Sequence, residues 1–316
     1  MKVVALAGGV GGAKLAEGLA QLLPPEDLTI IVNTGDDFYN YGLAISPDLD
    51  TVCYTLAGKA NPSTGWGLMD ESWNTLEQLK KLGDPVWFKM GDKDLATHLE
   101  RTRLLKGGEP LSAITKQFCR AWGIRHSILP MTDDRLATIV IDDTGRELDF
   151  QEYFVKYHWE PKVRLIRFNG AEKALPAPGV LESVQKCDLV IICPSNPFVS
   201  IDPILALPGI LPMMQQKTII SVSPIIGGQA VKGPLAKMIM ELTGELPSAD
   251  FIARYYYERG ILSGYILDEH DDCLTSQIRG WGIICAVTDT LMPDKKNRAR
   301  VAEITFNLGV QLRRSV

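Results

Sequence analysis

Five short apolar runs recur along the chain, and each ends in small or polar residues. The runs are Val3–Ala7, Leu28–Val32, Leu189–Cys193, Thr218–Val222 and Ile283–Val287. Continuous apolar runs without polar alternation are typical of strands covered on both faces, as in parallel sheets. The pattern therefore predicts a mostly parallel sheet whose strands lie far apart in the sequence.

Helical spacing occupies much of the chain between these runs. Leu15, Leu19 and Leu22 share one apolar face, and Pro24-Pro25 ends that helix. From about residue 61 to about residue 125 the pattern is helical again. One expected face carries Leu95, Leu99 and Thr102, and the next helix carries Ile114, Phe118 and Ala121. This stretch is expected to be a helical insertion lying over the sheet, without being a separate domain.

A β-hairpin is predicted after the insertion. The segments Ala137–Ile141 and Leu148–Phe154 flank Asp142-Asp143-Thr144-Gly145, which is a turn signal. We therefore expect one α/β domain over residues 1–316. Its expected architecture is a Rossmann-like three-layer α/β/α sandwich with a mostly parallel sheet, the helical insertion at about 61–125 and this hairpin excursion.

Composition and net charge limit the kinds of partner that this protein is expected to bind. A net charge of −5 argues against a broad nucleic-acid surface, which normally requires a basic face. The six cysteines form no C-x-x-C pair, and no apolar run approaches the ~18 residues of a membrane span. Met1 leads directly into the predicted first strand, so we expect no signal peptide. We expect a cytoplasmic protein that binds neither nucleic acid nor membrane.

The first strand runs into Gly8, Gly9, Gly11 and Gly12, followed by Lys14 and an amphipathic helix. Glycines let backbone N–H groups approach a ligand, and the positive end of the following helix favours phosphate. The spacing matches neither the dinucleotide fingerprint nor the Walker loop completely. A phosphate or nucleotide site is the functional interpretation, and a tight turn without ligand is the alternative.

Polar tails follow the other apolar runs and are expected to face the same crevice, because ligands of open parallel sheets bind beyond the carboxyl ends of the strands. A second glycine-rich segment, Gly227-Gly228, leaves the run Thr218–Val222, and Ser195-Asn196 lies between two prolines. Two glycine loops suit an extended ligand with more than one phosphate, or with a phosphate and a base.

Carboxylates cluster in the predicted loops. Asp37 follows the second strand, and Asp48 and Asp50 lie in a loop that Pro47 anchors. In an extended loop, alternate residues point the same way and would offer two oxygen ligands to a divalent cation such as Mg²⁺. The alternative for Asp50 is a solvated loop. Asp92 is interpreted as a cap of the helix that begins near Asp94.

Aromatic residues lie beside the insertion, at Gly65-Trp66-Gly67, Trp73 and Trp87-Phe88-Lys89. Core packing is the alternative for each tryptophan, but a planar heterocycle would need such a wall, with Lys89 as a polar anchor. The chain has no G-x-S-x-G elbow and no H-E-x-x-H motif. Without these motifs, the mechanism that we expect is direct group transfer assisted by a metal, as in phosphoryl transfer.

Taken together, the ordered motifs resemble the 2-phospho-L-lactate transferases of deazaflavin coenzyme F(420) synthesis. The motifs, from Met1 to about Pro234, are AGGVGGAKL, NTGDD, SPDLDTVCYTL, GWGLMDESW, WFKMGDKDLATHLERT, ILPMTDD, FQEYFV, PSNPFVSI and SPIIGGQAVKGP. The resemblance implies transfer of a phospholactyl-type group from a guanosine diphospho-conjugate to the ribityl hydroxyl of the deazaflavin Fo, with release of GMP. It also implies dependence on Mg²⁺ and a homodimer.

The resemblance also implies roles for residues. Asp50 and Lys89 would contact Fo, with Trp87 beside them. The guanine nucleotide would be held by Gly8, Gly9, Gly11, Gly12, Lys14, Asn33, Ser195, Asn196, Gly227 and Gly228. We hypothesise that Asp37, Asp48 and Asp50 bind the metal, and that Asp50 and Asp37 activate the hydroxyl.

Two other functions stay open at this point. A nicotinamide-dependent oxidoreductase would use Asp36 as its ribose-binding acid, although the glycine spacing argues against it. A guanine-nucleotide-binding regulatory protein of a related branch would bind no Fo. The motifs do not distinguish phospholactyl, phosphoenolpyruvyl and phosphoglyceryl donors.

Overall fold

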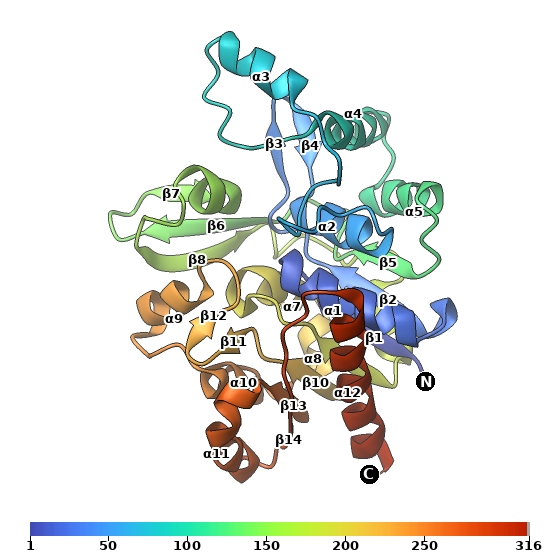
Figure 1. Cartoon of the computed structure of the whole chain (residues 1–316), viewed down its shortest axis with the longest axis vertical. Coiled ribbons are helices and arrows are strands. Elements are labelled where there is room, and N and C mark those ends of the chain that lie inside the picture. The colour runs from blue at the N-terminus through green and yellow to red at the C-terminus, as the bar shows by residue number, and fades with distance from the viewer. Residues whose placement is uncertain (315–316) are drawn as a thin grey trace.

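The apolar runs form the centre of a three-layer α/β/α sandwich (Figure 1), seen in a computed structural model that describes residues 1–314. Its main sheet has seven strands in the order β14-β13-β10-β9-β1-β2-β5, and every neighbouring pair is parallel. The strands are β1 (Val3–Ala7), β2 (Leu28–Val32), β5 (Ser127–Pro130), β9 (Leu189–Ile192), β10 (Thr218–Val222), β13 (Gly264–Leu267) and β14 (Ile284–Val287). The predicted fold class and all five predicted strands are confirmed.

The pattern of apolar runs did not predict two strands of this sheet, β5 and β13. β5 begins with an exposed serine and ends in Pro130 at the sheet edge, and β13 begins with Gly264. Proline and glycine are poor strand formers by themselves. These two strands exist because the sheet beside them supplies the hydrogen-bonding partner, which a local pattern does not contain.

Alternate residues of β1 feed two separate cores. Val3, Ala5 and Ala7 pack with α1 (Gly9–Leu22), α2 (Pro47–Leu56), α5 (Leu111–Ala121) and α12 (Lys295–Arg314). Val4 and Leu6 pack on the opposite face. That face is covered by α6 (Val180–Lys186), α8 (Ile210–Met214), α9 (Leu235–Thr243), α10 (Ala249–Tyr257) and α11 (Thr275–Gly280). The period of two along the strand thus builds both helical layers.

Smaller elements decorate the sandwich. They are the hairpin β3 (Phe38–Asn40) with β4 (Leu43–Ile45), the sheet β7 (Glu147–Asp149), β6 (Ala137–Asp142) and β8 (Val163–Asn169), the hairpin β11 (Ile225–Ile226) with β12 (Gln229–Ala230), and the short helix α7 (Asp202–Leu205). Short helical turns cover Pro25–Asp27, Glu152–Lys156, Pro197–Ile201 and Glu269–Leu274. No helix among residues 1–314 is long and apolar enough to cross a membrane.

The predicted hairpin is present as β6 and β7, but its second strand ends at Asp149. The segment that follows, which was expected to continue the strand to Phe154, turns helical at Glu152–Lys156. Phe150 and Tyr153 are both buried in the same core. Their spacing of three residues can bury both rings only on a helical turn, which overrides strand propensity.

The stretch from about 61 to 125 contains α3 (Asn74–Lys81), α4 (Asp92–Lys106) and α5. In Figure 1, α5 lies beside β5, whereas α3 and α4 extend beyond the sheet with the β3–β4 hairpin. Only part of the expected insertion therefore lies over the sheet.

The strand order contains one reversal. The chain adds β2 and then β5 on one side of β1, and afterwards returns to place β9 on the other side. In open α/β sheets this switch point opens a crevice at the carboxyl ends of the two strands, where ligands bind. The topology therefore places the site where β1 runs into Gly8 and β9 runs into Pro194.

The first helix offers a test of this packing. Leu19 is fully buried, whereas Leu22, which was expected to share its face, is 40% exposed. We expect Leu19→Ala to lower the free energy of unfolding by roughly 2–5 kcal/mol, because it removes buried methyl groups and leaves a cavity. Leu22→Ala on the same helix should cost less than about 1 kcal/mol. Urea unfolding of both variants measures the difference, and equal losses would contradict this packing.

Candidate functional site

The carboxyl ends of β1, β2 and β9 bring together several of the predicted site residues. The Ser195 hydroxyl donates to the Gly8 carbonyl at 2.8 Å and lies 3.2 Å from the Gly8 N–H, which donates to it. The Asn33 amide donates to Asp48 at 3.0 Å and to the Val199 carbonyl at 3.3 Å. Segments far apart in the sequence are thus joined at the switch point.

The glycines after β1 allow two other segments to approach the start of α1. A Cβ atom on Gly8 would lie 2.6 Å from Asp48 Oδ2, and one on Gly11 would lie 2.3 Å from the Pro194 carbonyl oxygen. A Cβ on Gly12 would lie 2.6 Å from Ser195 Oγ. Since real side chains never tolerate such contacts, only glycine fits. The helix begins at Gly9, so Gly9–Gly12 form its first turn and are not the loop that the sequence predicted.

Asp48 and Asp50 lie in the first turn of α2, where Pro47 occupies the first helical position. The expectation that an extended loop points both carboxylates the same way is therefore wrong, because residues two apart on a helix face different directions. Asp48 accepts from the Gly9 N–H at 2.8 Å and from Asn33. Asp50 points to α4. The two carboxylates therefore have separate partners.

Helix α4 presents a buried polar face to Asp50. Arg101 Nη1 donates to Asp50 Oδ2 at 3.0 Å, and Nη2 pairs with Oδ1. His98 lies between two carboxylates, with Nδ1 3.7 Å from Asp50 and Nε2 3.3 Å from Asp94. The Tyr54 hydroxyl donates to Asp94 at 2.6 Å. One charged network therefore links α2 to α4.

This network corrects the predicted face of α4. Leu99 was expected to be buried, yet it is 52% exposed, whereas Arg101 and His98 are each 1% exposed. Asp94, His98 and Arg101 follow a helical i, i+4, i+7 spacing that is visible in the sequence. Ionisable residues at that spacing are normally a solvated face, and only the partner Asp50 from α2 makes their burial favourable.

Electrostatics in the network follow from burial. Burial raises the pKa of Asp50, against the opposing charges of Arg101 and His98. Burial also acts to raise the pKa of Asp94. The hydrogen bond and the charge of His98 outweigh this effect, so the pKa of Asp94 is lowered. The Arg101 pKa is raised despite burial, because Asp50 lies beside it. The guanidinium therefore stays charged.

Asp36 and Asp37 lie between this network and the switch point, at the end of β2. The pKa values of both are raised well above the usual value, first by burial, with Asp48 adding to the rise at Asp36. Asp37 accepts from the Ser46 hydroxyl at 2.6 Å, but one oxygen of each carboxylate, Oδ1, is buried without a hydrogen-bond partner. Both residues line a small pocket with Phe38, Thr138 and Gln151.

These unpartnered oxygens bear on the metal hypothesis. Within residues 1–314, one group of three metal-ligating side chains has all its ligand atoms within 4.8 Å of one another, and it is Asp50, Asp94 and His98. Arg101 already supplies a positive charge to both oxygens of Asp50. The predicted set Asp37, Asp48 and Asp50 is not gathered in this way. The free oxygens belong instead to Asp37 and to Asp36, which the metal hypothesis did not include.

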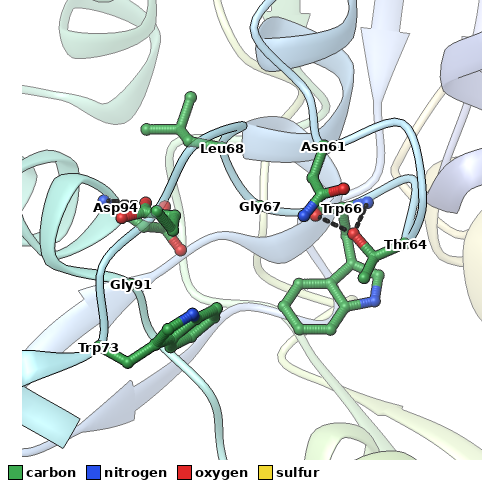
Figure 2. Close-up of a pocket in the computed structure, with 9 residues that line it drawn as sticks. Asn61, Thr64, Trp66, Gly67, Leu68, Trp73, Gly91 and Asp94 are labelled. Carbon is green, nitrogen blue, oxygen red and sulfur yellow. Dashed lines mark hydrogen bonds between the residues drawn. The ribbon is translucent and has the colours of Figure 1, made fainter.

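An aromatic pocket lies beside α4 (Figure 2). Trp66 and Trp73 line it together with Asn61, Thr64 and Asp94. Both indoles are partly exposed. Trp87 and Lys89 do not line this pocket: the Trp87 ring packs 5.8 Å from Phe38 and 5.7 Å from Phe88, and Lys89 is exposed. The expected aromatic wall is thus divided into two groups.

The aromatic pocket adjoins the start of α1. A Cβ on Gly65 would lie 2.6 Å from the Val10 side chain, and Lys232 Nζ donates to the Thr64 carbonyl at 2.6 Å. Burial, Arg298 and Lys232 together lower the pKa of Lys14, which is half-buried on α1. Positive charge therefore gathers where the pocket meets the helix start.

The second glycine segment has a structural role in the hairpin β11–β12. Gly227 and Gly228 adopt φ values of +55° and +76°, which suit a two-residue hairpin turn. The Gly227 N–H donates to Asp271 at 3.0 Å. A direct nucleotide contact of these glycines stays a prediction.

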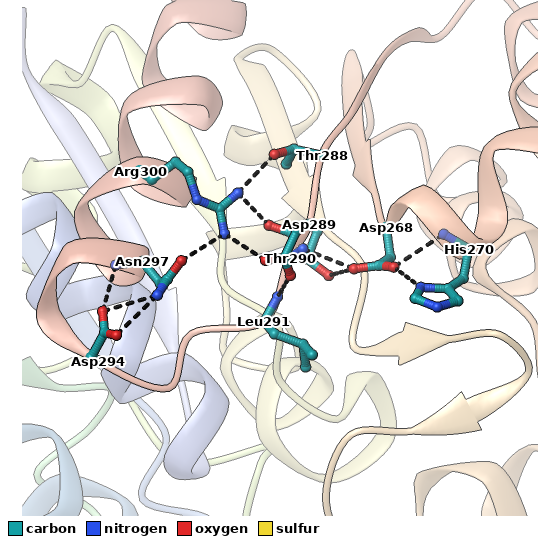
Figure 3. A network of polar contacts seen from close by, with 9 residues as sticks. All are labelled: Asp268, His270, Thr288, Asp289, Thr290, Leu291, Asp294, Asn297 and Arg300. Carbon is teal, nitrogen blue, oxygen red and sulfur yellow. Dashed lines mark hydrogen bonds and ion pairs between the residues drawn. The ribbon is translucent and has the colours of Figure 1, made fainter.

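A polar network that the sequence did not reveal holds the ends of β13 and β14 (Figure 3). Asp268 accepts from the Thr290 N–H at 2.8 Å and from His270 Nδ1 at 2.6 Å. Arg300 on α12 donates to Thr288 at 2.9 Å and to the Asp289 carbonyl. The tail Thr288-Asp289, expected to face the crevice, is tied down by α12.

The sequence model of the family described as "2-phospho-L-lactate transferase CofD" matches residues 3–277. This chain belongs to the CofD family. The resemblance seen in the motifs is confirmed, and membership in this transferase family favours a transferase over the nicotinamide-dependent alternative.

Relatives cover the full length. A protein of Streptomyces griseus called "Phosphoenolpyruvate transferase" is 41% identical over 99% of this chain and 100% of its own length. Proteins of the same name from Thermobifida fusca and from Mycobacterium sp. strain KMS are 40% and 38% identical, over 99% and 97% of this chain and 99% and 100% of theirs. Two crystal structures of Bacillus halodurans BH3568, one titled as a member of the UPF0052 family, share the fold. Their TM-scores are 0.63 and 0.60 at 15% identity, with 96% of this chain and 99% and 98% of theirs covered.

The Asp50–Arg101 pair generates a prediction. Arg101→Ala would leave a buried carboxylate without its counter-charge, so we expect a loss of roughly 3–5 kcal/mol in the free energy of unfolding. Arg103 lies two residues further on the same helix, is 68% exposed and pairs with Glu100. Arg103→Ala should therefore cost less than about 1 kcal/mol. Urea unfolding compares the two, and a small loss at Arg101 would show that the pair is dispensable.

Proposed function

We propose that this chain transfers a phosphoenolpyruvyl-type group from a guanosine diphospho-conjugate to the ribityl hydroxyl of the deazaflavin Fo, releasing GMP, in coenzyme F(420) biosynthesis. The observation that carries the proposal is the approach of the segment that lines the aromatic pocket to the start of α1, at Gly65 and Val10. Lys232 adds positive charge at the same place, because it donates to the Thr64 carbonyl. A transferase must hold a planar acceptor and a phosphorylated donor side by side, and these two neighbouring sites suit that pair.

The names of the relatives favour the phosphoenolpyruvyl donor. Phospholactyl and phosphoglyceryl groups differ from it by a few atoms and remain alternatives. The donor's diphosphate would lie against the first turn of α1, whose positive end favours anions, with Lys14 and Lys232 adding charge. Ser195, Asn196, Asn33 and the segment Gly227-Gly228 remain proposed nucleotide contacts around it.

The acceptor ring would lie against Trp66 and Trp73. These indoles replace Trp87 as the first choice for the aromatic wall, because they line a pocket that also contains Asp94. Lys89 stays a proposed acceptor contact. A homodimer is proposed from family resemblance alone.

The residues around Asp37 fit a divalent cation. Asp36 and Asp37 each keep one buried oxygen without a partner, and burial disfavours the ionised form of both. Buried carboxylates of this kind are normally paired or coordinate metals. We propose that Asp37, with Asp36 or Asp48, holds Mg²⁺. When bound, Mg²⁺ neutralises charge on the donor phosphates.

The proposed transfer is a direct displacement. The ribityl oxygen forms a bond to the phosphorus that carries the three-carbon acid, and the bond from that phosphorus to the GMP oxygen breaks. The hydroxyl proton passes to a buried carboxylate, for which Asp37 and Asp50 are the proposed catalytic residues. Arg101 holds the Asp50 carboxylate in one orientation.

A thermal-shift experiment tests the cation site. The raised pKa values mean that Asp36 and Asp37 favour folding while protonated and lose that contribution as the pH rises through those pKa values. A cation should offset the loss, so we expect Mg²⁺ to raise Tm by roughly 2–5 °C at about pH 8 and by much less at about pH 5.

The matched variants localise this effect. Asp37→Asn should reduce the Mg²⁺-dependent shift, whereas Asp143→Asn, in the exposed turn after β6, should leave it unchanged. An undiminished Mg²⁺-dependent rise in Tm in the Asp37 variant would show that the cation binds elsewhere.

A transfer assay tests the reaction. Purified protein with Mg²⁺ and Fo is offered the phosphoenolpyruvyl, phospholactyl and phosphoglyceryl conjugates of guanosine diphosphate, and products are identified by mass. We expect GMP release and incorporation of the phosphoenolpyruvyl group. Asp50→Asn should reduce transfer by at least ~100-fold while the far-UV spectrum stays unchanged.

Two outcomes would count against the proposal. Transfer from none of the three conjugates would remove the enzyme assignment. If guanine nucleotide still bound but Fo did not, the regulatory protein of a related branch would be favoured.

A further inference from the structure

Two buried thiols meet behind the Asp50–Arg101 pair. Cys53 on α2 and Cys119 on α5 have their sulfur atoms 3.9 Å apart, although the residues are 66 positions apart in sequence. Both are free, and they are 3% and 5% exposed. A disulfide bond joins sulfur atoms roughly 2 Å apart, so the two sulfurs have to approach each other by roughly 2 Å to form one here.

The two sulfurs are not equivalent. The hydrogen bond from Cys53 lowers the pKa of Cys119, and the same bond, with burial, raises the pKa of Cys53. The thiolate is the nucleophile in thiol oxidation, so Cys119 is the sulfur that reacts first.

We propose that Cys53 and Cys119 are a redox modification site, which forms a reversible disulfide between α2 and α5 on exposure to a peroxide. The Cys119 thiolate attacks one peroxide oxygen, takes up that OH as a sulfenic acid, and the other oxygen leaves as water after protonation. The Cys53 sulfur then attacks the Cys119 sulfur, and the sulfenic OH leaves with the Cys53 proton as a second water. The two thiols lose two electrons, which reduce the peroxide.

The bond would act on the Asp50–Arg101 pair from both sides. Cys53 lies three residues after Asp50 on α2, so the two share one side of that helix. Arg101 lies 5.9 Å over the ring of Phe118, which immediately precedes Cys119. Drawing the two sulfurs together therefore moves the supports of both partners, which makes the charged network responsive to oxidation.

The experiment uses the full chain carrying Cys273→Ser, because Cys273 is the exposed cysteine and would otherwise react. Reduced protein is treated with hydrogen peroxide, denatured, alkylated and analysed by mass spectrometry. We expect the loss of two hydrogen atoms per chain and a linked peptide pair containing Cys53 and Cys119. Both should revert with dithiothreitol. Cys193, whose pKa is raised by burial alone, should still be recovered in alkylated form and serves as a built-in control.

A second measurement tests the tether itself. Oxidation should raise Tm by roughly 4 °C or more, reversibly, because the bond restricts the unfolded chain, and Cys119→Ser should abolish the shift. Recovery of both thiols in reduced form, oxidation of Cys119 without a link, or an unchanged Tm would overturn the proposal. None of these readouts depends on the transferase reaction, so they are independent of the proposed function.

Discussion

The need to compensate buried negative charge controls the arrangement of this site. Asp36, Asp48, Asp50 and Asp94 are all buried, and Arg101 is a buried cation among them. An unpaired buried carboxylate is far more costly than a paired one, so Arg101 and the start of α1 must lie where they do. Helices α2 and α4 are joined by that requirement, and with them the aromatic pocket beside α4.

The glycines after β1 serve the same constraint. They act by letting Asp48, Ser195 and the Pro194 carbonyl reach the first turn of α1, at distances that any Cβ would block. Asp48 then accepts from a backbone N–H of that turn, which pairs a buried carboxylate with the positive end of a helix. The glycines that suggested phosphate binding are thus also a requirement of the protein's own packing.

Groups that this compensation leaves without a partner are the ones available to bind a ligand. Asp36 and Asp37 retain free oxygens, and Lys14 stays half-buried near other positive groups. Two indoles line a pocket next to Gly65, which approaches Val10 at the start of α1. A cation, a diphosphate and a planar ring are the kinds of group that would complete these surfaces.

Local pattern was sufficient for the strands β1, β2, β9, β10 and β14, the parallel sheet and the family, because apolar runs and ordered motifs are properties of adjacent residues. It was insufficient for β5 and β13, which depend on a neighbouring strand. It also misplaced the buried face of α4 and the direction of Asp50. Burying Arg101 and His98 is favourable only because Asp50 on another helix contacts them. The sequence contains all three residues, but it does not show that they are in contact. The tertiary structure decides which charged groups pair over long sequence distances. It therefore decides which carboxylate oxygens have a hydrogen-bond partner and which have none.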